Sequence, residues 1–223
     1  MREATDLEVS GDRGQTRLQY VSETAEQLEP DEAYEAEPEP DAEELLDAEV
    51  VARRDLALSH VRKFGDPILK TKARPVDVEG FDDALRAQIA RMGALMNDSL
   101  GIGLAATQVG VLNRVLVYRV HAQAAVAALV NPELEWRSSE EEIAEEGCLS
   151  LPKVHVEVER PVYVRVSARD GDGDPILIEA SGLEARVILH ELDHLDGVLI
   201  LSRTSREQRK EAMRILREQQ API

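Results

Sequence analysis

The sequence predicts an α+β fold: antiparallel sheets packed around a central helix, a C-terminal helix, and a disordered acidic N-terminal extension. Two observations point to the sheets. Short apolar segments, several alternating at period two, follow one another through the middle of the chain. The last two expected helices come after these strands rather than between them, so the βαβ rhythm of a parallel sheet is missing. The third observation is the concentration of acidic residues at the front of the chain.

Residues 1–55 form the expected extension. They carry 18 Asp or Glu against 5 Lys or Arg, a net charge of -13 out of the -18 of the whole chain. Most of 1–40 is rich in Glu, Pro and Ala and is expected to be disordered, because it cannot bury enough apolar surface to offset its conformational entropy. A helix capped by Asp41 is the alternative for 41–58. The folded domain is expected over 56–223.

The bulk composition restricts the class of protein. A chain of 223 residues with 43% hydrophobic residues can form one domain with a core. The negative charge argues against nucleic acid as the main partner. The single cysteine, Cys148, excludes an intrachain disulfide and fits a reducing compartment. No apolar run is long enough for a membrane span and no signal peptide is recognisable, so a cytoplasmic protein without membrane contact is expected.

The expected elements of the folded domain follow from periodicity. A helix is predicted from the spacing of apolar residues over 81–101, with Asp82 as N-cap and Gly101 as stop. A second helix is predicted over 183–196 and a third, charged one over 205–220. The expected strands are 114–120, 127–131, 154–159, 162–168 and 175–180.

The stretch VILHELDHLDGVL, residues 187–199, carries the strongest chemical signal. His190 and His194 are four residues apart, so on a helix they project from one face and can bind one metal ion. Glu191 can then act as general base on a water molecule without being a ligand. The alternative is a helix whose histidines are packed or solvated. Apolar flanks favour the metal, because buried ionisable groups need partners; Asp193 could accept a hydrogen bond from a ring N–H or an arginine.

The third ligand is less obvious from spacing. No histidine follows His194, and Glu207 and Glu211 lie in a charged segment that looks exposed. Cys148, in EEGCLSLP, is the remaining candidate, because a thiolate is a strong ligand for Zn or Fe(II). A buried, structural cysteine is the alternative.

The loop GIGLAATQVG, residues 101–110, contains a G-x-G-x-x-A pattern. A dinucleotide-binding loop needs a strand before it and a helix after it, and here the expected order is reversed. Glycines and alanines instead suit a wall where the backbone approaches a ligand closely. Gln108 would supply one amide for hydrogen bonding.

Together, these three stretches resemble the motifs of the peptide deformylase family. The first motif, G-x-G-x-A-A-x-Q, matches Gly101, Gly103, Ala105, Ala106 and Gln108. The second, E-G-C-L-S, matches residues 146–150. The third, H-E-x-D-H-[LT]-x-G, matches His190, Glu191, Asp193, His194, Leu195 and Gly197. The similarity covers roughly 58–216. Two positions depart from the family's pattern. Leu189 stands where family members often have Gln, and His155 stands where they often have an arginine beside the pocket.

The resemblance implies an enzyme that removes the N-formyl group from N-formylmethionyl nascent peptides. It implies that 56–223 is the catalytic domain and that its central helix binds a metal. It further implies that one divalent metal, Fe(II) with Zn or Ni as alternatives, is bound by Cys148, His190 and His194. Glu191 would be the general acid and base, and Gln108 and the Leu149 N–H would stabilise the negative charge on the formyl oxygen. The implied substrate-binding residues are Ile102, Gly103, Leu183 and Val187. The ribosome exit region is an implied partner.

Two alternatives remain open at this point. A general zinc metallopeptidase would take a Glu ligand from the last helix and leave Cys148 and Gln108 without roles. A non-enzymatic binding module derived from a deformylase would keep the fold and use the acidic extension for contacts. The presence of all three metal ligands and Glu191 argues against the second alternative.

Overall fold

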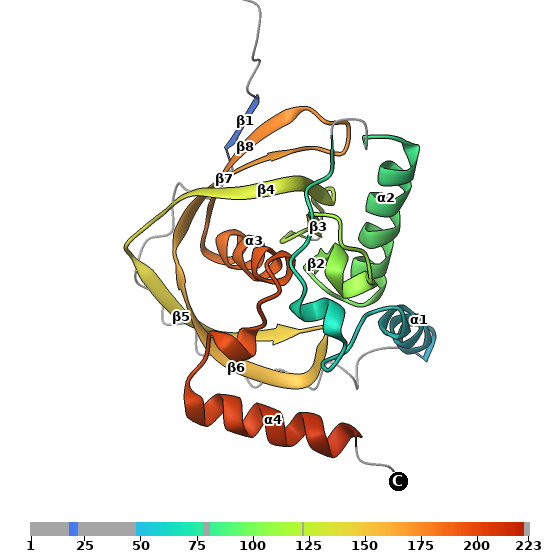
Figure 1. Ribbon diagram of the computed structural model, residues 1–223, viewed down its shortest axis with the longest axis vertical. Coiled ribbons are helices and arrows are strands. Elements are labelled where there is room, and N and C mark those ends of the chain that lie inside the picture. The colour runs from blue at the N-terminus through green and yellow to red at the C-terminus, as the bar shows by residue number, and fades with distance from the viewer. Residues whose placement is uncertain (1–17, 22–47, 78–80, 122, 221–223) are drawn as a thin grey trace, which may run out of the picture.

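The computed structural model describes residues 18–21, 48–77, 81–121 and 123–220, and its architecture is α+β as predicted (Figure 1). The helices are α1 (Ala48–Ser59), α2 (Asp83–Asp98), α3 (Gly182–Leu195) and α4 (Arg206–Gln220). The strands are β1 (Leu18–Val21), β2 (Gly103–Ala105), β3 (Val115–Tyr118), β4 (Ala127–Arg137), β5 (Glu141–Cys148), β6 (Leu151–Pro161), β7 (Tyr163–Arg169) and β8 (Pro175–Ser181).

The strands form two sheets. The larger sheet has the order β1-β8-β7-β4-β3-β2, and β5 and β6 form a separate hairpin. All pairings are antiparallel except that of β1 with β8, which is parallel. The antiparallel sheets predicted from the period-two segments are therefore confirmed, and the five expected strands correspond to β3, β4, β6, β7 and β8.

Helix α3 lies at the centre of the molecule, with the larger sheet on one side and the β5–β6 hairpin on the other (Figure 1). Its sequence explains this position, because apolar residues occupy several of its faces and nearly every residue from 184 to 195 is buried. Leu192 and Leu195 join the core between α3 and the larger sheet. A second core lies between β6 and α4, and a third between α2 and the larger sheet.

Helix α2 begins as predicted and ends earlier. The Asp82 side chain accepts a hydrogen bond from the Leu85 N–H at 2.9 Å, as an N-cap does. The C-cap is Ser99 rather than Gly101. Leu100 already has a left-handed φ of 58°, and the Gly101 N–H closes the turn on the Met96 carbonyl at 2.9 Å. The expected stop at Gly101 was therefore wrong by two residues.

Three features of the hairpin and the extension depart from the main expectation. Strand β1 (Leu18–Val21) lies within 1–40, most of which was expected to be disordered, and it pairs with β8. Helix α1 corresponds to the alternative of a helix over 41–58, and strand β5 was not expected. Strand β5 is rich in glutamate, which is depleted in strands, but it is stabilised by pairing with β6 along its whole length. Helix α1 crosses the expected boundary at residues 55 and 56, and its expected cap Asp41 lies outside the described residues. Within the part of the chain that is described, no helix is long and apolar enough to span a membrane.

Candidate metal centre and substrate cleft

Three side chains from two distant segments meet beside α3. His190 and His194 lie one turn apart on this helix, and Cys148 ends β5. Their potential ligand atoms all lie within 4.8 Å of one another, and the Cys148 Sγ is 3.2 Å from the His194 Nε2. The helical spacing of the histidines thus produces the shared face predicted from the sequence.

The tight turn between β5 and β6 brings Cys148 to this position. The pairing register shifts between Gly147 and Cys148, where the hairpin turns. The Ser150 carbonyl accepts a hydrogen bond from the Phe64 N–H at 2.9 Å, and the Leu149 carbonyl accepts one from the Lys63 Nζ at 3.0 Å. The segment before the 3₁₀-helix Pro67–Lys70 therefore holds the turn that carries the thiol.

The donor set fits a divalent transition metal. One thiolate and two imidazoles suit Zn or Fe(II) and leave a coordination position for water. Burial alone would raise the pKa of the Cys148 thiol, but the adjacent rings of His194 and His190 lower it well below its ordinary value. The thiolate is the form that binds metals. The described residues contain this one group of three or more such donors.

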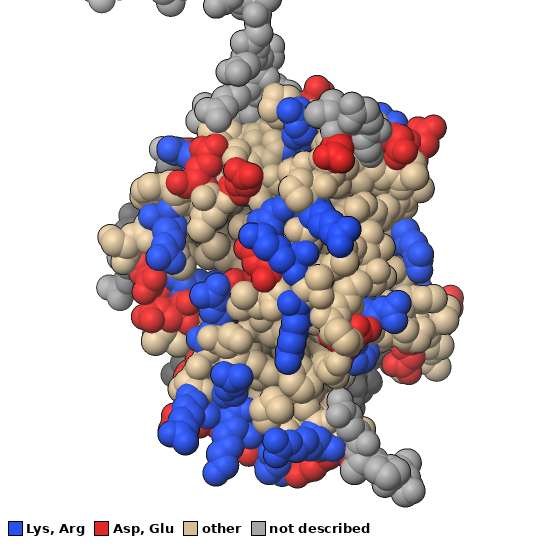
Figure 2. Space-filling view, viewed as in Figure 1, with Lys and Arg blue, Asp and Glu red and all other residues tan. Residues whose placement is uncertain are grey.

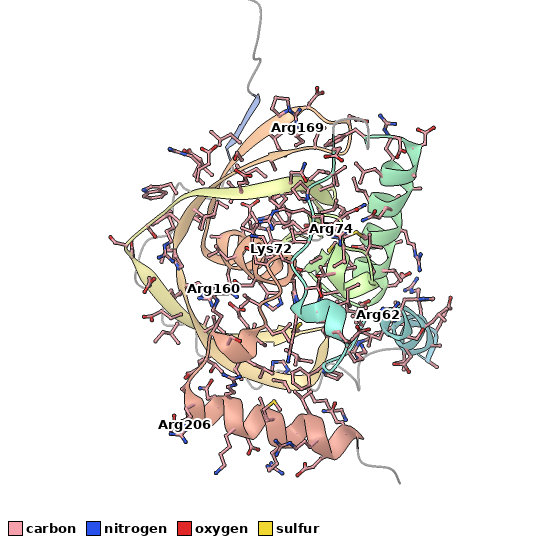
Figure 3. The ribbon with its side chains drawn as sticks, in the orientation of Figure 1. Arg62, Lys72, Arg74, Arg160, Arg169 and Arg206 are labelled. Carbon is pink, nitrogen blue, oxygen red and sulfur yellow. The ribbon has the colours of Figure 1, made fainter. Side chains whose placement is uncertain are left out.

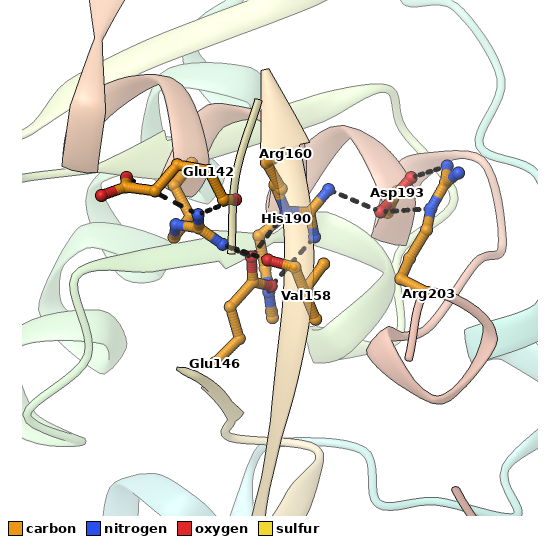
Figure 4. Close-up of polar contacts among 8 residues, drawn as sticks. Glu142, Glu146, Val158, Arg160, His190, Asp193 and Arg203 are labelled. Atoms are coloured by element: carbon orange, nitrogen blue, oxygen red, sulfur yellow. Dashed lines mark hydrogen bonds and ion pairs between the residues drawn. The ribbon is translucent and has the colours of Figure 1, made fainter. Parts of the chain in front are cut away.

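Glu146 orients His190 from behind (Figure 4). Its Oε2 lies 2.9 Å from the His190 Nδ1, which leaves the Nε2 of the same ring for a metal. Arg160 donates to both oxygens of this carboxylate at 2.6 and 2.9 Å, and Arg186 donates to one at 3.0 Å. Burial alone would raise the pKa of Glu146, but the hydrogen bonds from Arg160 and His190 lower it to about 2. The carboxylate is therefore ionised in the folded protein.

Asp193 continues this network away from the histidines. It accepts a hydrogen bond from Arg160 at 2.9 Å and two from Arg203 at 3.1 and 2.6 Å. An arginine partner was one of the two expectations for Asp193, and it is confirmed. Arg160 thus bridges the carboxylates of Glu146 and Asp193 (Figure 4). This bridge ties α3 to β5 and β6.

Glu191 is buried, with 3% of its surface exposed, and its Oε2 has no hydrogen-bond partner among the described residues. Burial raises the pKa of its carboxyl above the ordinary value, and the nearby Cys148 adds to the rise. A Cβ atom at Gly103 would collide with the Glu191 carboxylate. Gly103, the second glycine of the loop, is therefore required for space beside the Glu191 carboxylate.

Gln108 lies on the other side of the cysteine. Its Oε1 accepts a hydrogen bond from the Ala105 N–H at 2.8 Å, which fixes the amide plane. Its Nε2 then points at the Ser150 Oγ, 3.3 Å away, and at the Cys148 Sγ, 3.8 Å away. The short 3₁₀-helix Ala106–Val109 carries Gln108, and the Thr107 hydroxyl donates to the His194 carbonyl at 3.2 Å. The loop and α3 are thus joined directly.

A cleft of about 630 Å³ opens beside these groups. It is lined by nine of the ten site residues predicted from sequence, and these are Ile102, Gly103, Gln108, Cys148, Leu149, Leu183, Val187, His190 and Glu191. His194 is the tenth and lies buried behind them. Leu183 and Ile102 are about half exposed at the cleft, whereas Val187 is buried. The structure therefore brings all the predicted residues to one place.

Sequence reasoning missed the supporting residues. Arg186 belongs to none of the three motifs, and Glu146 was given no role although it begins the E-G-C-L-S motif next to Cys148. Arg160, which follows His155 in the sequence by five residues, is 4% exposed and does not line the cleft. Arg54 and Asp55 of α1 line the cleft although they belong to the expected extension.

Comparison with known proteins agrees with this geometry. The family model described as polypeptide deformylase matches residues 58–210. A protein of Acidothermus cellulolyticus named peptide deformylase is 45% identical over 73% of this chain and 88% of its own length. The structure of a peptide deformylase from Synechococcus elongatus in complex with actinonin superposes with a TM-score of 0.66 at 40% identity, covering 70% of this chain and 85% of that one. The structure of a peptide deformylase from Thermotoga maritima superposes with a TM-score of 0.62 at 43% sequence identity, and the match covers 65% of this chain and 96% of that one.

Proposed function

Because this chain belongs to the polypeptide deformylase family, we propose that its cleft removes the N-formyl group from N-formylmethionyl nascent peptides and releases formate. One observation carries this proposal: a thiol and two imidazoles converge within 4.8 Å beside a cleft that also holds an unpartnered buried carboxylate. A metal-dependent hydrolase needs this combination of a metal site and a nearby base.

Cys148, His190 and His194 would hold the metal ion. The native ion is proposed to be Fe(II), with Zn or Ni able to replace it, because thiolate and imidazole ligands suit all three. The orientation of His190 by Glu146 supports this assignment, since ligating histidines usually donate their other ring N–H to a carboxylate. When bound, the metal would lower the pKa of a water molecule and polarise the formyl carbonyl.

Glu191 is proposed to move the proton. It would accept a proton from the attacking water and hand it to the leaving amine of methionine. Its raised pKa supports both steps, because a base works best when its pKa approaches the operating pH. Its position in the cleft, against Gly103 and one residue from His190, supports the reach to such a water.

Two N–H donors are proposed to stabilise the negative charge that develops on the formyl oxygen. These are the Gln108 side-chain amide and the Leu149 backbone N–H. The amide of Gln108 is held by its own Oε1 contact, so little reorganisation is needed when charge develops. One donor of this kind is worth about 3 kcal/mol in a transition state.

The apolar part of the cleft is proposed to bind methionine. Val187 and Leu183 lie one and two helical turns before His190 on α3, and both line the cleft. Ile102 and Gly103 would pair with the substrate backbone, since Gly103 begins the short edge strand β2. The unbranched thioether side chain of methionine would pack against these aliphatic groups.

The central test is formate release. Protein purified without oxygen and analysed for metal is expected to release formate from formyl-Met-Ala-Ser and to leave acetyl-Met-Ala-Ser intact. Metal-loaded protein that releases no formate would favour the non-enzymatic module. Cleavage of internal peptide bonds in place of formate release would favour the general metallopeptidase. For that alternative, Glu207 and Glu211 of α4 are unfavourable ligands, because both are exposed and Glu211 is paired with Arg214.

We also propose that the enzyme works in the cytoplasm near the ribosome exit region, where formylated chains emerge. Helix α4 carries five Lys or Arg against three Glu, and Figure 2 shows cationic side chains over this end of the molecule although the chain as a whole is acidic. Arg206 begins this helix at the surface (Figure 3). Salt-sensitive cosedimentation with ribosomes tests the proposal; equal binding after charge removal on α4 would contradict it.

A further inference from the structure

A second pocket, of about 590 Å³, lies beside the first turn of α3. Its lining comes from the end of β3, the connection to β4, the start of β4, β8 and Glu184 of α3. It shares no lining residue with the substrate cleft, although Leu183 of that cleft and Glu184 are consecutive in the sequence. The pocket is therefore a separate site, and none of the proposed catalytic residues belongs to it.

Most of this pocket is apolar. Val120, Ala127 and Ile176 line it at the margin of the core that α3 shares with the larger sheet, where they are only partly buried. Leu129 and Ile178 continue the same wall into the core. Binding sites for small molecules commonly have volumes of about 300–1,000 Å³ and mainly apolar walls with a few polar groups. The size and lining of the pocket therefore suit a small ligand with an apolar body.

One carboxylate is buried at this wall. Glu184 is 9% exposed, and its Oε1 accepts a hydrogen bond from the Tyr118 hydroxyl at 2.9 Å. Within the described part of the chain, no other hydrogen bond and no ion pair reaches this carboxylate. An ionised carboxylate can accept about four hydrogen bonds, and buried charges are normally paired. The remaining acceptor sites of Glu184 are therefore available to a ligand in the pocket.

The other charged or titratable groups of the lining leave this carboxylate unpaired. They are Arg119, His121 and Asp170. Among the described residues, Arg119 forms no ion pair with Glu184 or Asp170. The Asp170 Oδ1 accepts the N–H groups of Asp172 and Asp174 at 2.9 Å, so it closes its own hairpin turn. With histidine counted as neutral, two carboxylates and one guanidinium give the lining a net charge of -1.

The N-terminal extension does not complement this charge. Residues 22–47 connect β1, which pairs with β8, to α1, and they contain twelve Asp or Glu and no Lys or Arg. Such a segment would bring like charge to a buried carboxylate, and like charges repel strongly where water is excluded. The charge of the pocket therefore favours a cation that is not part of this chain.

We propose that this pocket binds a small primary amine with an apolar body. Its ammonium group pairs with Glu184, because three N–H donors suit the free acceptor sites of this carboxylate. Its apolar part packs against Val120, Ala127 and Ile176. The proposal does not depend on the deformylase function, because the pocket contains none of the residues assigned to that reaction.

The test titrates three probes of the same ring size, cyclohexylamine, cyclohexanol and cyclohexanecarboxylate, into the zinc-loaded full chain and follows backbone amide NMR shifts. The amine, with about seven non-hydrogen atoms, is expected to bind with a Kd on the order of 1 mM. The alcohol should bind at least about tenfold more weakly, because hydrogen bonds to a charged group are stronger when the donor is also charged. The shifts caused by the amine should centre on Val120, Ala127 and Ile176. Val187 of the substrate cleft should not respond.

Glu184→Gln keeps the size of the side chain and removes its charge. It should weaken amine binding to the level of the alcohol and leave the Kd of the alcohol unchanged. Glu184→Asp keeps the charge and should still bind the amine more tightly than the alcohol. Glu179→Gln is the matched control, because Glu179 lies on β8, is paired with Arg165 and does not line the pocket. It should leave all three Kd values unchanged.

The parent protein alone can overturn the proposal. Equal Kd values for the amine and the alcohol, tighter binding of the carboxylate, or amine shifts confined to the substrate cleft would each do so. Self-association of the parent that the amine does not displace would assign the apolar wall to a second copy of the chain and would also overturn it.

The variants decide the role of Glu184. A folded Glu184→Gln protein that still prefers the amine would exclude Glu184 as the recognising group. If Glu184→Gln does not fold, Glu184→Asp decides: loss of the amine preference in that variant, with the fold retained, supports recognition by the carboxylate at its native reach, whereas parent-like shifts at Ile102 in place of Ile176 contradict it. Amine binding without formate release would refute only the deformylase function.

Discussion

Glu146→Gln is the substitution for which the structure predicts the clearest cost. The carboxylate is 5% exposed and accepts hydrogen bonds from Arg160, Arg186 and His190. Its pKa falls from 4.5 to about 2, and one pH unit corresponds to about 1.4 kcal/mol, so folding favours the ionised form by about 3 kcal/mol. Removing one charge from a buried ion pair typically costs about 3–5 kcal/mol, and the value of about 3 kcal/mol obtained from the pKa of Glu146 lies in this range.

The sign of the pH dependence follows from the lowered pKa. A carboxyl whose pKa is depressed in the folded protein stabilises it fully above the unfolded value of 4.5. This stabilisation is lost as the pH falls from about 4.5 to about 2. At pH 7, Glu146→Gln is therefore expected to lower the free energy of unfolding by about 3 kcal/mol, and the difference from the parent should shrink towards pH 2.

Urea unfolding followed by circular dichroism measures this difference, first with a chelator present and then with the metal bound. Glu145→Gln is the matched control, because Glu145 is the preceding residue and its side chain is 69% exposed. It should change the free energy by less than about 0.5 kcal/mol. Metal affinity of Glu146→Gln should also fall by about 10- to 100-fold, because His190 loses its orienting partner. Equal urea midpoints for Glu146→Gln and the parent at pH 7 would refute the reasoning.

Four further substitutions test the proposed roles. Glu191→Gln should retain the metal and lower kcat by about 10³-fold, as loss of a general base does, and parent-like turnover would remove Glu191 from the mechanism. Cys148→Ser should lose metal on dialysis, whereas unchanged metal content would mean that another residue is the third ligand. Gln108→Leu should lower kcat by about 10²-fold with little change in KM; an effect on KM alone would contradict an oxyanion role. Gly103→Ala should displace the Glu191 carboxylate and lower kcat by about 10²-fold with the metal retained, whereas Gly171→Ala, which meets no group closer than 3.4 Å, should leave kcat unchanged.

Local patterns accounted for most of the elements and for the identity of the reactive groups. The i, i+4 spacing of His190 and His194 determines a shared face on any α-helix, so this part of the metal centre could be predicted without coordinates. The N-cap at Asp82 is likewise a short-range interaction, and it was confirmed. Cys148 was connected to the histidines first as the remaining candidate ligand and then through the family resemblance. Gln108 was connected to them only through the resemblance, because nothing in its local sequence indicates which distant residues it meets.

The parts that sequence did not predict depend on pairing between distant segments. Strand β5 has poor strand propensity, and its conformation follows from its hydrogen bonds to β6. Glu146 acquires its role from Arg160 and Arg186, which lie 14 and 40 residues away in sequence. No periodicity encodes such a convergence.

The sequence by itself determined which groups can bind a metal and move a proton, since thiolate, imidazole and carboxylate chemistry belongs to the residue and helical spacing is local. The tertiary structure decided that these groups share one cleft, that arginines keep the carboxylate of Glu146 ionised behind His190, and that α1 closes one wall of the cleft. The physical reason is that burial and long-range contacts set the solvation and the neighbours of each group, and both arise only when the chain has folded.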